Sequence, residues 1–259
     1  MNSSSNPPTV KQLAQSARAS YAMSSSGTLE TRLENVQKSA PAGYNVVPRH
    51  TNKDMSTFQN STDPSRYIIS HRGTDFSGNS TKSDLKSDLS IVLGDTNDPL
   101  NIRRKKRTEK IIRDLRKGSI EPKIHLSSHS LGAGSTNYAM ANSKLVRNSV
   151  ISHDTFNGGS TPIAGLAKLP HEPGTREHSI VFEKSTHHRI ENDPVSENQA
   201  GSYIGKSIVY RQKREHSFPK RVLKLMKPII EQSVLGKAIG FIASKAIDVA
   251  KNHTISNFT

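Results

Sequence analysis

The sequence predicts an α/β domain, in which parallel strands alternate with helices. The first observation is a buried strand at 123–126 that leads through residues 128–132 into a helix at 133–140. The second is a β-branched and aromatic strand, at 66–71, that runs directly into Arg72-Gly73-Thr74. Strands joined to helices in this way are typical of a sheet with helices on its faces. The 259 residues are enough for one such domain with a large core.

The turn Ser128-His129-Ser130-Leu131-Gly132 has the pattern of a nucleophile elbow. In such a turn a strained serine projects its hydroxyl at the carboxyl end of the sheet, and the residues two before and two after are small because strand and helix nearly touch. Gly132 meets this requirement, and Ser128 is small although the usual motif has glycine there. The alternative interpretation is that Ser130 is an ordinary helix N-cap.

Other motifs stand in a fixed order around this turn. Arg72-Gly73-Thr74 and the spaced pair Asp84 and Asp88 precede it, whereas Asp154-Thr155-Phe156-Asn157-Gly158-Gly159 and Asn192-Asp193-Pro194-Val195 follow it. This order resembles the class-three, fungal-type lipases of the α/β-hydrolase superfamily over residues 40–259. The resemblance implies a central mixed, mostly parallel sheet flanked by helices. It also implies a serine hydrolase that cleaves carboxylic esters of lipids through an acyl-enzyme.

The resemblance assigns catalytic roles to residues of this chain. Ser130 is the nucleophile, Asp193 is the acid that orients the base, and Thr74 and Leu131 form the oxyanion hole. The order of the triad in this superfamily is Ser, Asp, His, so the base is a histidine after Asp193. His253 follows Asp193 by 60 residues, which resembles the usual separation, and is the first choice.

His216 is the alternative base, 23 residues after Asp193. Its neighbours in the sequence include Arg214 and Lys220, and their positive charges disfavour the protonated imidazolium that catalysis must form.

The sequence contains no motif for a metal or a nucleotide cofactor. It has no cysteine, no His-Glu-x-x-His helix and no phosphate-binding glycine-lysine loop. We therefore expect neither a metal nor a cofactor. The remaining histidines are expected to be solvated or to lie in turns, and include His171, His178, His187 and His188.

The domain organisation is simple. Residues 1–9 are polar and predicted to be disordered, and residues 10–259 form one lipase-like domain. A C-terminal amphipathic helical region at about 220–251 carries charges that disfavour a membrane span. It is predicted to pack on the sheet and deliver His253, or alternatively to dock on lipid. The segment 75–82 after the oxyanion motif is polar, so no large apolar lid is expected.

The formal net charge of +15 is large for this length, and basic residues cluster at 103–107 and 206–227. Such a charge favours an anionic membrane surface and nonspecific binding to nucleic acid. Alternatively, residues 103–107 are the solvated first turn of an amphipathic helix that continues through Leu115. Aromatic residues make up only 5% of the chain, which argues against a base-stacking platform.

Two further expectations concern location and function. The absence of cysteine and of a signal sequence indicates an intracellular or virion-associated protein, peripheral to membranes if it binds them. The rival function is a weakly active or inactive lipase-like structural or polyanion-binding protein, for instance in a virion, and a second rival is an esterase or amidase for soluble substrates. Ser128 and the polar segment 75–82 keep the first rival open.

Overall fold

The computed structural model describes residues 6–73, 99–158, 161–162, 174–191, 201–202 and 204–211, with backbone alone at 161–162 and 201–202. Thr74, Asp193, His216 and His253 lie outside these residues, as does the region 220–251.

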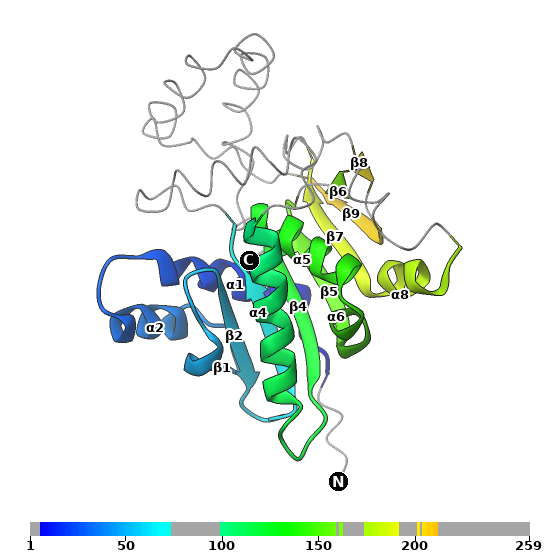
Figure 1. The fold of residues 1–259 in the computed structure, drawn as a ribbon. Coiled ribbons are helices and arrows are strands. Elements are labelled where there is room, and N and C mark those ends of the chain that lie inside the picture. The colour runs from blue at the N-terminus through cyan, green and yellow to red at the C-terminus, as the bar shows by residue number, and fades with distance from the viewer. Residues whose placement is uncertain are drawn as a thin grey trace.

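A seven-stranded sheet in the order β1-β2-β3-β4-β5-β7-β9 forms the centre of the protein (Figure 1). Its strands are β1 (Tyr44–Val46), β2 (Met55–Asn60), β3 (Arg66–His71), β4 (Lys123–His129), β5 (Val150–Phe156), β7 (Ser185–Ile190) and β9 (Lys206–Tyr210). The first two pairings, β1 with β2 and β2 with β3, are antiparallel, and the pairings from β3 to β9 are parallel. The predicted mixed, mostly parallel sheet is confirmed. A separate pair is formed by β6 (Thr161–Pro162) and β8 (Gly201–Ser202).

Helices cover both faces of this sheet. They are α1 (Val10–Ala19), α2 (Leu29–Lys38), α4 (Pro99–Leu115), α5 (Leu131–Asn142), α6 (Lys144–Ser149) and α8 (Arg176–Lys184), with 3-10 turns η1 (Ser20–Ser24) and η2 (Pro48–His50). Thr9 caps α1 in a reciprocal pair with Gln12, as a capping box does. None of the helices in the described ranges is long and apolar enough to cross a bilayer.

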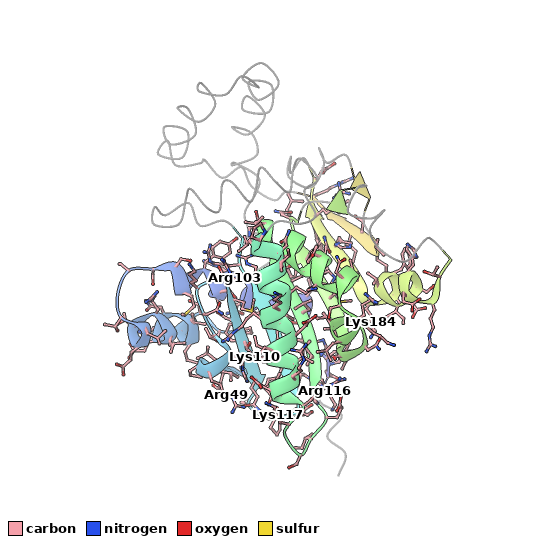
Figure 2. All side chains as sticks on the ribbon, in the orientation of Figure 1. Arg49, Arg103, Lys110, Arg116, Lys117 and Lys184 are labelled. Carbon is pink, nitrogen blue, oxygen red and sulfur yellow. The ribbon has the colours of Figure 1, made fainter. Side chains whose placement is uncertain are left out.

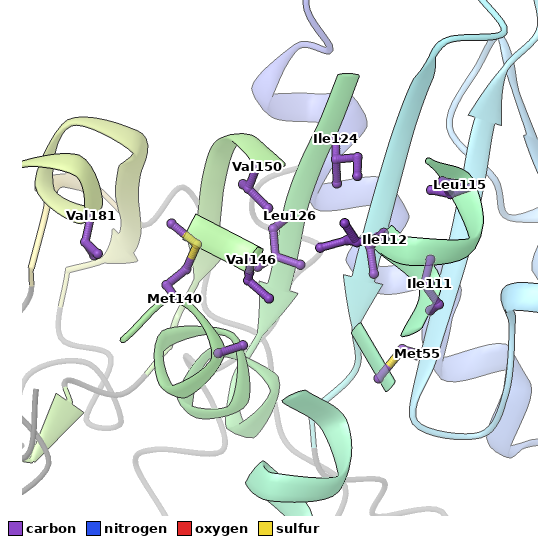
Figure 3. Packing of buried hydrophobic residues seen from close by; sticks show 12 residues of the cluster. Met55, Ile111, Ile112, Leu115, Ile124, Leu126, Met140, Val146, Val150 and Val181 are labelled. Carbon is purple, nitrogen blue, oxygen red and sulfur yellow. The ribbon is translucent and has the colours of Figure 1, made fainter. Parts of the chain in front are cut away.

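Two apolar clusters divide the core between the two faces. On one face, Ile111 and Ile112 of α4 pack with Ile69 of β3 and Leu126 of β4, and this cluster extends to α5, α6 and α8 (Figure 3). On the other face, α1, α2 and η1 supply the apolar side chains that pack on Phe58, Ile68 and Phe156. Each fully buried aliphatic or aromatic side chain contributes about 1.5–3 kcal/mol, so both clusters hold the strand ends in place.

The sequence-based interpretation of α4 needs one correction. The helix is amphipathic and buries Ile111, Ile112 and Leu115 as predicted, yet Arg104 within the basic run is fully buried. A helix that packs along the sheet buries positions i and i+4 on one face, so Arg104 lies on the same side as Thr108 and Ile111.

The interpretation of the histidines on β7 was wrong. His187 and His188 are each 1% exposed rather than solvated, because β7 is an interior strand that lies between β5 and β9. His178 is partly exposed, and His171 lies outside the described part of the chain.

Candidate active site

Ser130 occupies a strained turn between β4 and α5. Its backbone has φ 54° and ψ −129°, a conformation that non-glycine residues rarely adopt. Its side chain makes no capping hydrogen bond to α5, so the alternative that Ser130 is an ordinary N-cap is wrong. The side chain is half-buried, whereas Ser128 and His129 before it are buried. The turn therefore presents the hydroxyl at the carboxyl end of the parallel strands.

Close packing around the turn explains the two glycines of the motifs. A Cβ on Gly132 would lie 2.4 Å from the carbonyl oxygen of His71 and 2.7 Å from that of Arg72. A Cβ on Gly73 would lie 2.7 Å from the Ser130 Cβ and 2.8 Å from the carbonyl oxygen of His129. The end of β3 therefore touches both the nucleophile turn and the first turn of α5, and only glycine fits at either contact.

The structure also accommodates serine at position 128. Its side chain is fully buried, and its Oγ lies 2.9 Å from the Oγ1 of Thr136 on α5. Thr136 also donates to the carbonyl oxygen of Ala133, 3.1 Å away. A polar pair thus satisfies the hydroxyl at the strand–helix contact, where a buried and unpaired hydroxyl would be costly.

The N-terminus of α5 lies directly beside Ser130. Leu131 is the first residue of α5, where the first N–H groups of a helix have no acceptor within the helix and carry its positive dipole end. Thr74 follows Gly73 directly in the chain, and Gly73 packs on Ser130 from the side of β3. Thr74 lies outside the described residues, so its pairing with Leu131 in an oxyanion hole stays a prediction.

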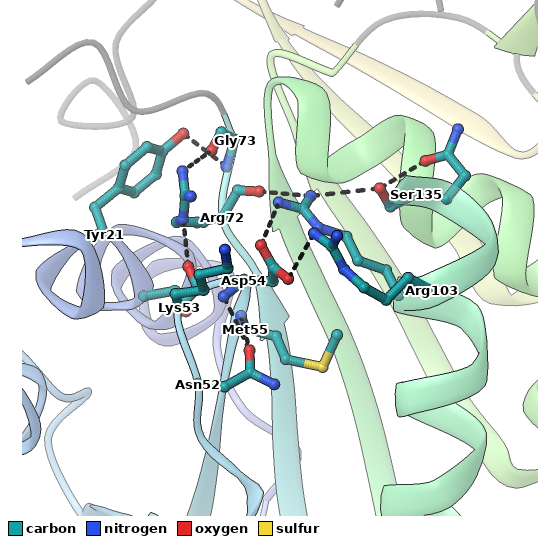
Figure 4. Close-up of polar contacts among 12 residues, drawn as sticks. Tyr21, Asn52, Lys53, Asp54, Met55, Arg72, Gly73, Arg103 and Ser135 are labelled. Atoms are coloured by element: carbon teal, nitrogen blue, oxygen red, sulfur yellow. Dashed lines mark hydrogen bonds and ion pairs between the residues drawn. The ribbon is translucent and has the colours of Figure 1, made fainter. Parts of the chain in front are cut away.

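Tyr21 links the end of β3 to the end of β4 through hydrogen bonds. The N–H of Gly73 donates to the Tyr21 hydroxyl over 2.9 Å (Figure 4). That hydroxyl also lies 2.7 Å from Nδ1 of His129. The Tyr21 and His129 rings also meet edge to face, with centroids 5.8 Å apart. Tyr21 comes from η1, far away in the sequence, and nothing in its local pattern marks it as part of the site.

A buried ionic network supports the same strand end from the other side (Figure 4). Asp54 pairs with Arg103 at 3.0 Å and with Arg104 at 3.7 Å. Arg104 donates through Nη1 to the carbonyl oxygen of Arg72 at 3.0 Å and to Ser135 of α5 at 3.3 Å. The buried guanidinium thus joins α4, α5 and the residue before Gly73. Sequence reasoning placed residues 103–107 in a solvated or anion-binding run and missed this role of Arg104.

Asn157 links the elbow to the strand that precedes Asp193. The N–H of Ser130 donates to the carbonyl oxygen of Phe156 at 3.1 Å, and the N–H of Asn157 donates to that of His188 at 2.9 Å. The side-chain Oδ1 of Asn157 accepts from the N–H of Ile190 at 2.9 Å. Asn157 has φ 44°, in the left-handed region that asparagine tolerates better than most residues.

These bonds place the end of β7 relative to the nucleophile. Ile190 ends β7, and Asp193 follows it by three residues in the sequence. In the sheet order, β7 lies two strands from β4, with β5 between them. The described residues therefore bring the end of β7, which precedes Asp193 in the sequence, to the same edge of the sheet as Ser130.

A second Ser-Asp-His constellation lies within the sheet itself. Asp154 accepts from Ser152 at 3.0 Å and lies 3.1 Å from Nε2 of His188, whose Nδ1 lies 2.9 Å from the hydroxyl of Tyr210. The Ser152 hydroxyl also lies 2.9 Å from Nδ1 of His125 on β4. This network therefore joins β4, β5, β7 and β9 through their side chains.

Burial lowers the pKa of three further histidines, His125, His187 and His153. Burial lowers the pKa of His125 to about 4, with a further contribution from Arg66, and burial lowers that of His187 to about 4. The pKa of His153 is lowered well below its usual value by burial and then by neighbouring His187. Within the described ranges, no group of three or more His, Asp or Glu side chains could hold a metal ion.

Comparison with known proteins supports the fold. No protein-family model matches the sequence, and no curated protein sequence matches it significantly. One solved structure, described as the crystal structure of M37 lipase, matches with a TM-score of 0.54 and 15% identity, over 98% of this chain and 85% of that one. At this identity the similarity concerns the fold alone. With the sheet order and the flanking helices, it shows that the chain has the α/β-hydrolase fold.

Proposed function

We propose that this protein is a serine hydrolase that cleaves carboxylic esters of lipids through an acyl-enzyme on Ser130. The observation that carries the proposal is the strained, half-exposed Ser130, held between glycines at the carboxyl end of the sheet. A module without catalysis has no physical reason to keep backbone strain of this kind at one serine.

In the proposed reaction, the Ser130 Oγ attacks the ester carbonyl carbon while a histidine takes the hydroxyl proton. The N–H groups of Leu131 and Thr74 donate to the oxyanion that forms, and the histidine then protonates the leaving alcohol. Water hydrolyses the acyl-enzyme by the same steps and releases the acid. Asp193 orients the histidine, for which His253 is the first candidate and His216 the second.

The lipid ester as substrate class rests on the resemblance of the motifs to class-three lipases, supported by the fold shared with the M37 lipase structure. The chemistry uses no metal or cofactor. The inactive, polyanion-binding alternative is favoured by the basic surface but gives no account of the strain at Ser130. An activity test therefore separates the two.

Labelling with a fluorescent fluorophosphonate tests the nucleophile, because the reagent reacts only with an activated serine. We expect wild type and Ser128→Gly to be labelled and Ser130→Ala to be unlabelled, with the modified peptide mapped by mass spectrometry. Ester hydrolysis by Ser130→Ala should fall by a factor of about 10⁴ to 10⁶ in kcat, as in other triads. An unlabelled wild type, or full activity in Ser130→Ala, contradicts the proposal.

The base is tested by the pair His253→Ala and His216→Ala. We expect His253→Ala to match Ser130→Ala in its loss of hydrolysis, and His216→Ala to keep most of the activity. The reverse result assigns the base to His216, and removal of residues 250–259 should then leave turnover intact.

A further inference from the structure

Six cations gather on the outer side of α4 and the adjacent turn before β2. They are Arg49, Lys53, Arg103, Lys106, Arg107 and Lys110, and Figure 2 shows Arg49, Arg103 and Lys110 on one side of the molecule. One face of α4 carries four of them, Arg103, Lys106, Arg107 and Lys110. The Arg107 guanidinium donates to the carbonyl oxygen of Arg49 at 3.4 Å, which joins helix and turn. We call this set the α4 basic face.

Among the residues that the structure describes, most of this charge has no carboxylate partner. Arg103 pairs with Asp54 and Lys110 with Asp114. Arg49, Lys53, Lys106 and Arg107 have no carboxylate within 4.0 Å among the described residues. A cluster of like charges without counter-charges costs free energy in the isolated protein, and an external anion removes that cost.

Two buried nitrogen atoms of this region also have no hydrogen-bond partner in the part of the chain that the structure describes. They are Nε2 of His50, which is 4% exposed, and Nε of Arg107. Burial lowers the pKa of His50, and the charges of Arg49, Arg107 and Lys110 lower it further against the opposing charge of Asp114. The local potential at this place is therefore positive.

The α4 basic face adjoins the candidate active site. Arg103 shares Asp54 with Arg104, and Arg104 donates to the carbonyl oxygen of Arg72 beside Gly73. Gly73 in turn packs on Ser130. The Arg103 end of the α4 basic face is therefore linked to the edge of the sheet that carries Ser130.

We propose that the α4 basic face docks the protein on the surface of an anionic phospholipid bilayer, next to the site at Ser130. This inference deepens the proposed function and rests on it for the substrate, but the docking itself needs no turnover. Clusters of about 4–8 Lys and Arg on an amphipathic helix are the pattern that anionic headgroups attract. Cations on the outward side of a helix fit a planar array of lipid headgroups. They fit a single strand of nucleic acid less well, because proteins bind such a strand in a groove and stack its bases on aromatic side chains.

Sedimentation with phosphatidylserine-containing vesicles tests the docking surface. The test variant carries Arg49→Gln, Lys53→Gln, Lys106→Gln and Arg107→Gln. The control removes the same charge elsewhere through Lys11→Gln, Lys38→Gln, Lys144→Gln and Arg176→Gln, all exposed positions. Each cation near the bilayer contributes on the order of fivefold in partitioning, so we expect the test variant to bind several hundredfold more weakly and the control to remain within about tenfold of wild type.

Four further measurements complete the test. Binding of wild type should be weak on phosphatidylcholine vesicles and should fall steeply between about 50 and 500 mM salt as screening increases. Thermal unfolding must show that both variants fold. Ser130→Ala should bind vesicles as tightly as wild type does, because docking needs no turnover. Loss of activity alone therefore does not contradict the docking proposal.

Equal loss of vesicle binding in the test and control variants would overturn the proposal, because net charge rather than this face would then be responsible. Tighter binding of wild type to a short DNA duplex than to the vesicles, at equal phosphate concentration and salt, would also overturn it. That result would assign the face to nucleic acid.

Discussion

Replacement of Gly132 by alanine should disrupt the elbow more than any other conservative change in α5. The new Cβ would meet two backbone carbonyl oxygens of the β3 end, at 2.4 Å and 2.7 Å, whereas ordinary contacts begin near 3.4 Å. Neither oxygen belongs to a side chain that could rotate away. The start of α5 must therefore move by about 1 Å relative to β3, and overpacking of this kind costs about 1–3 kcal/mol.

The same displacement should affect catalysis more strongly than stability. Leu131 and Ser130 begin the moved segment, so the proposed oxyanion donor and the proposed nucleophile shift together away from the side of Gly73. A misplacement of about 1 Å at reacting groups costs on the order of 10²-fold in rate. We expect Gly132→Ala to unfold at lower urea concentration and to react with the fluorophosphonate about 10²-fold more slowly than wild type.

Gly118→Ala is the matched control. Its Cβ would lie 3.3 Å from the carbonyl oxygen of Leu115 as its nearest neighbour, and the loop after α4 has room to adjust. Both substitutions reduce the entropy of the unfolded chain equally, so the difference between them isolates the contact. If Gly132→Ala matches Gly118→Ala in both urea midpoint and labelling rate, the close approach of α5 to β3 is not a feature of the protein.

Three other predictions test the supports of the site. Asn157→Gly keeps the left-handed backbone but leaves the N–H of Ile190 without its acceptor, so the unfolding free energy should fall by about 1–3 kcal/mol. The kcat should fall with little change in KM, and an unchanged kcat would contradict the link from Asn157 to the site. Asp54→Ala leaves the buried guanidinium of Arg104 without its carboxylate and should lower the unfolding free energy, measured in urea, by about 3–5 kcal/mol. Glu109→Gln, which removes an exposed ion pair, should lower it by less than about 1 kcal/mol, and equal losses would refute the argument. The pKa values of His125 and His187 are lowered to about 4 in the folded protein, so the unfolded chain binds more protons below about pH 6.5. The unfolding free energy should therefore be full above that pH and should fall by about 1.4 kcal/mol per pH unit per histidine toward pH 4. A urea midpoint that stays constant from pH 7 to 4 would show that these histidines are not buried in the neutral form.

The local sequence determined the elements that carry their own pattern. The strand at 66–71, the strand that begins at 123 and the helix after Ser130 all depend on nearest neighbours: β-branched runs, small residues at the turn, and apolar spacing along a helix. The elbow was recognisable for the same reason, because its steric demand falls on residues within two positions of Ser130. The assignments of Asp193, His253, His216 and Thr74 remain predictions from the resemblance.

The tertiary structure alone decided what surrounds these elements. The polarity of His187, His188 and Arg104 predicted exposure, and the sheet order and the packing of α4 bury all three. Tyr21 hydrogen-bonds to His129, which lies 108 positions away in the sequence, and Asn157 hydrogen-bonds to Ile190 of β7, 33 positions away. Such contacts depend on which strands become neighbours and which helix face meets the sheet. That outcome is a property of the whole packed core, in which a buried polar group is stable only where distant residues supply its partners.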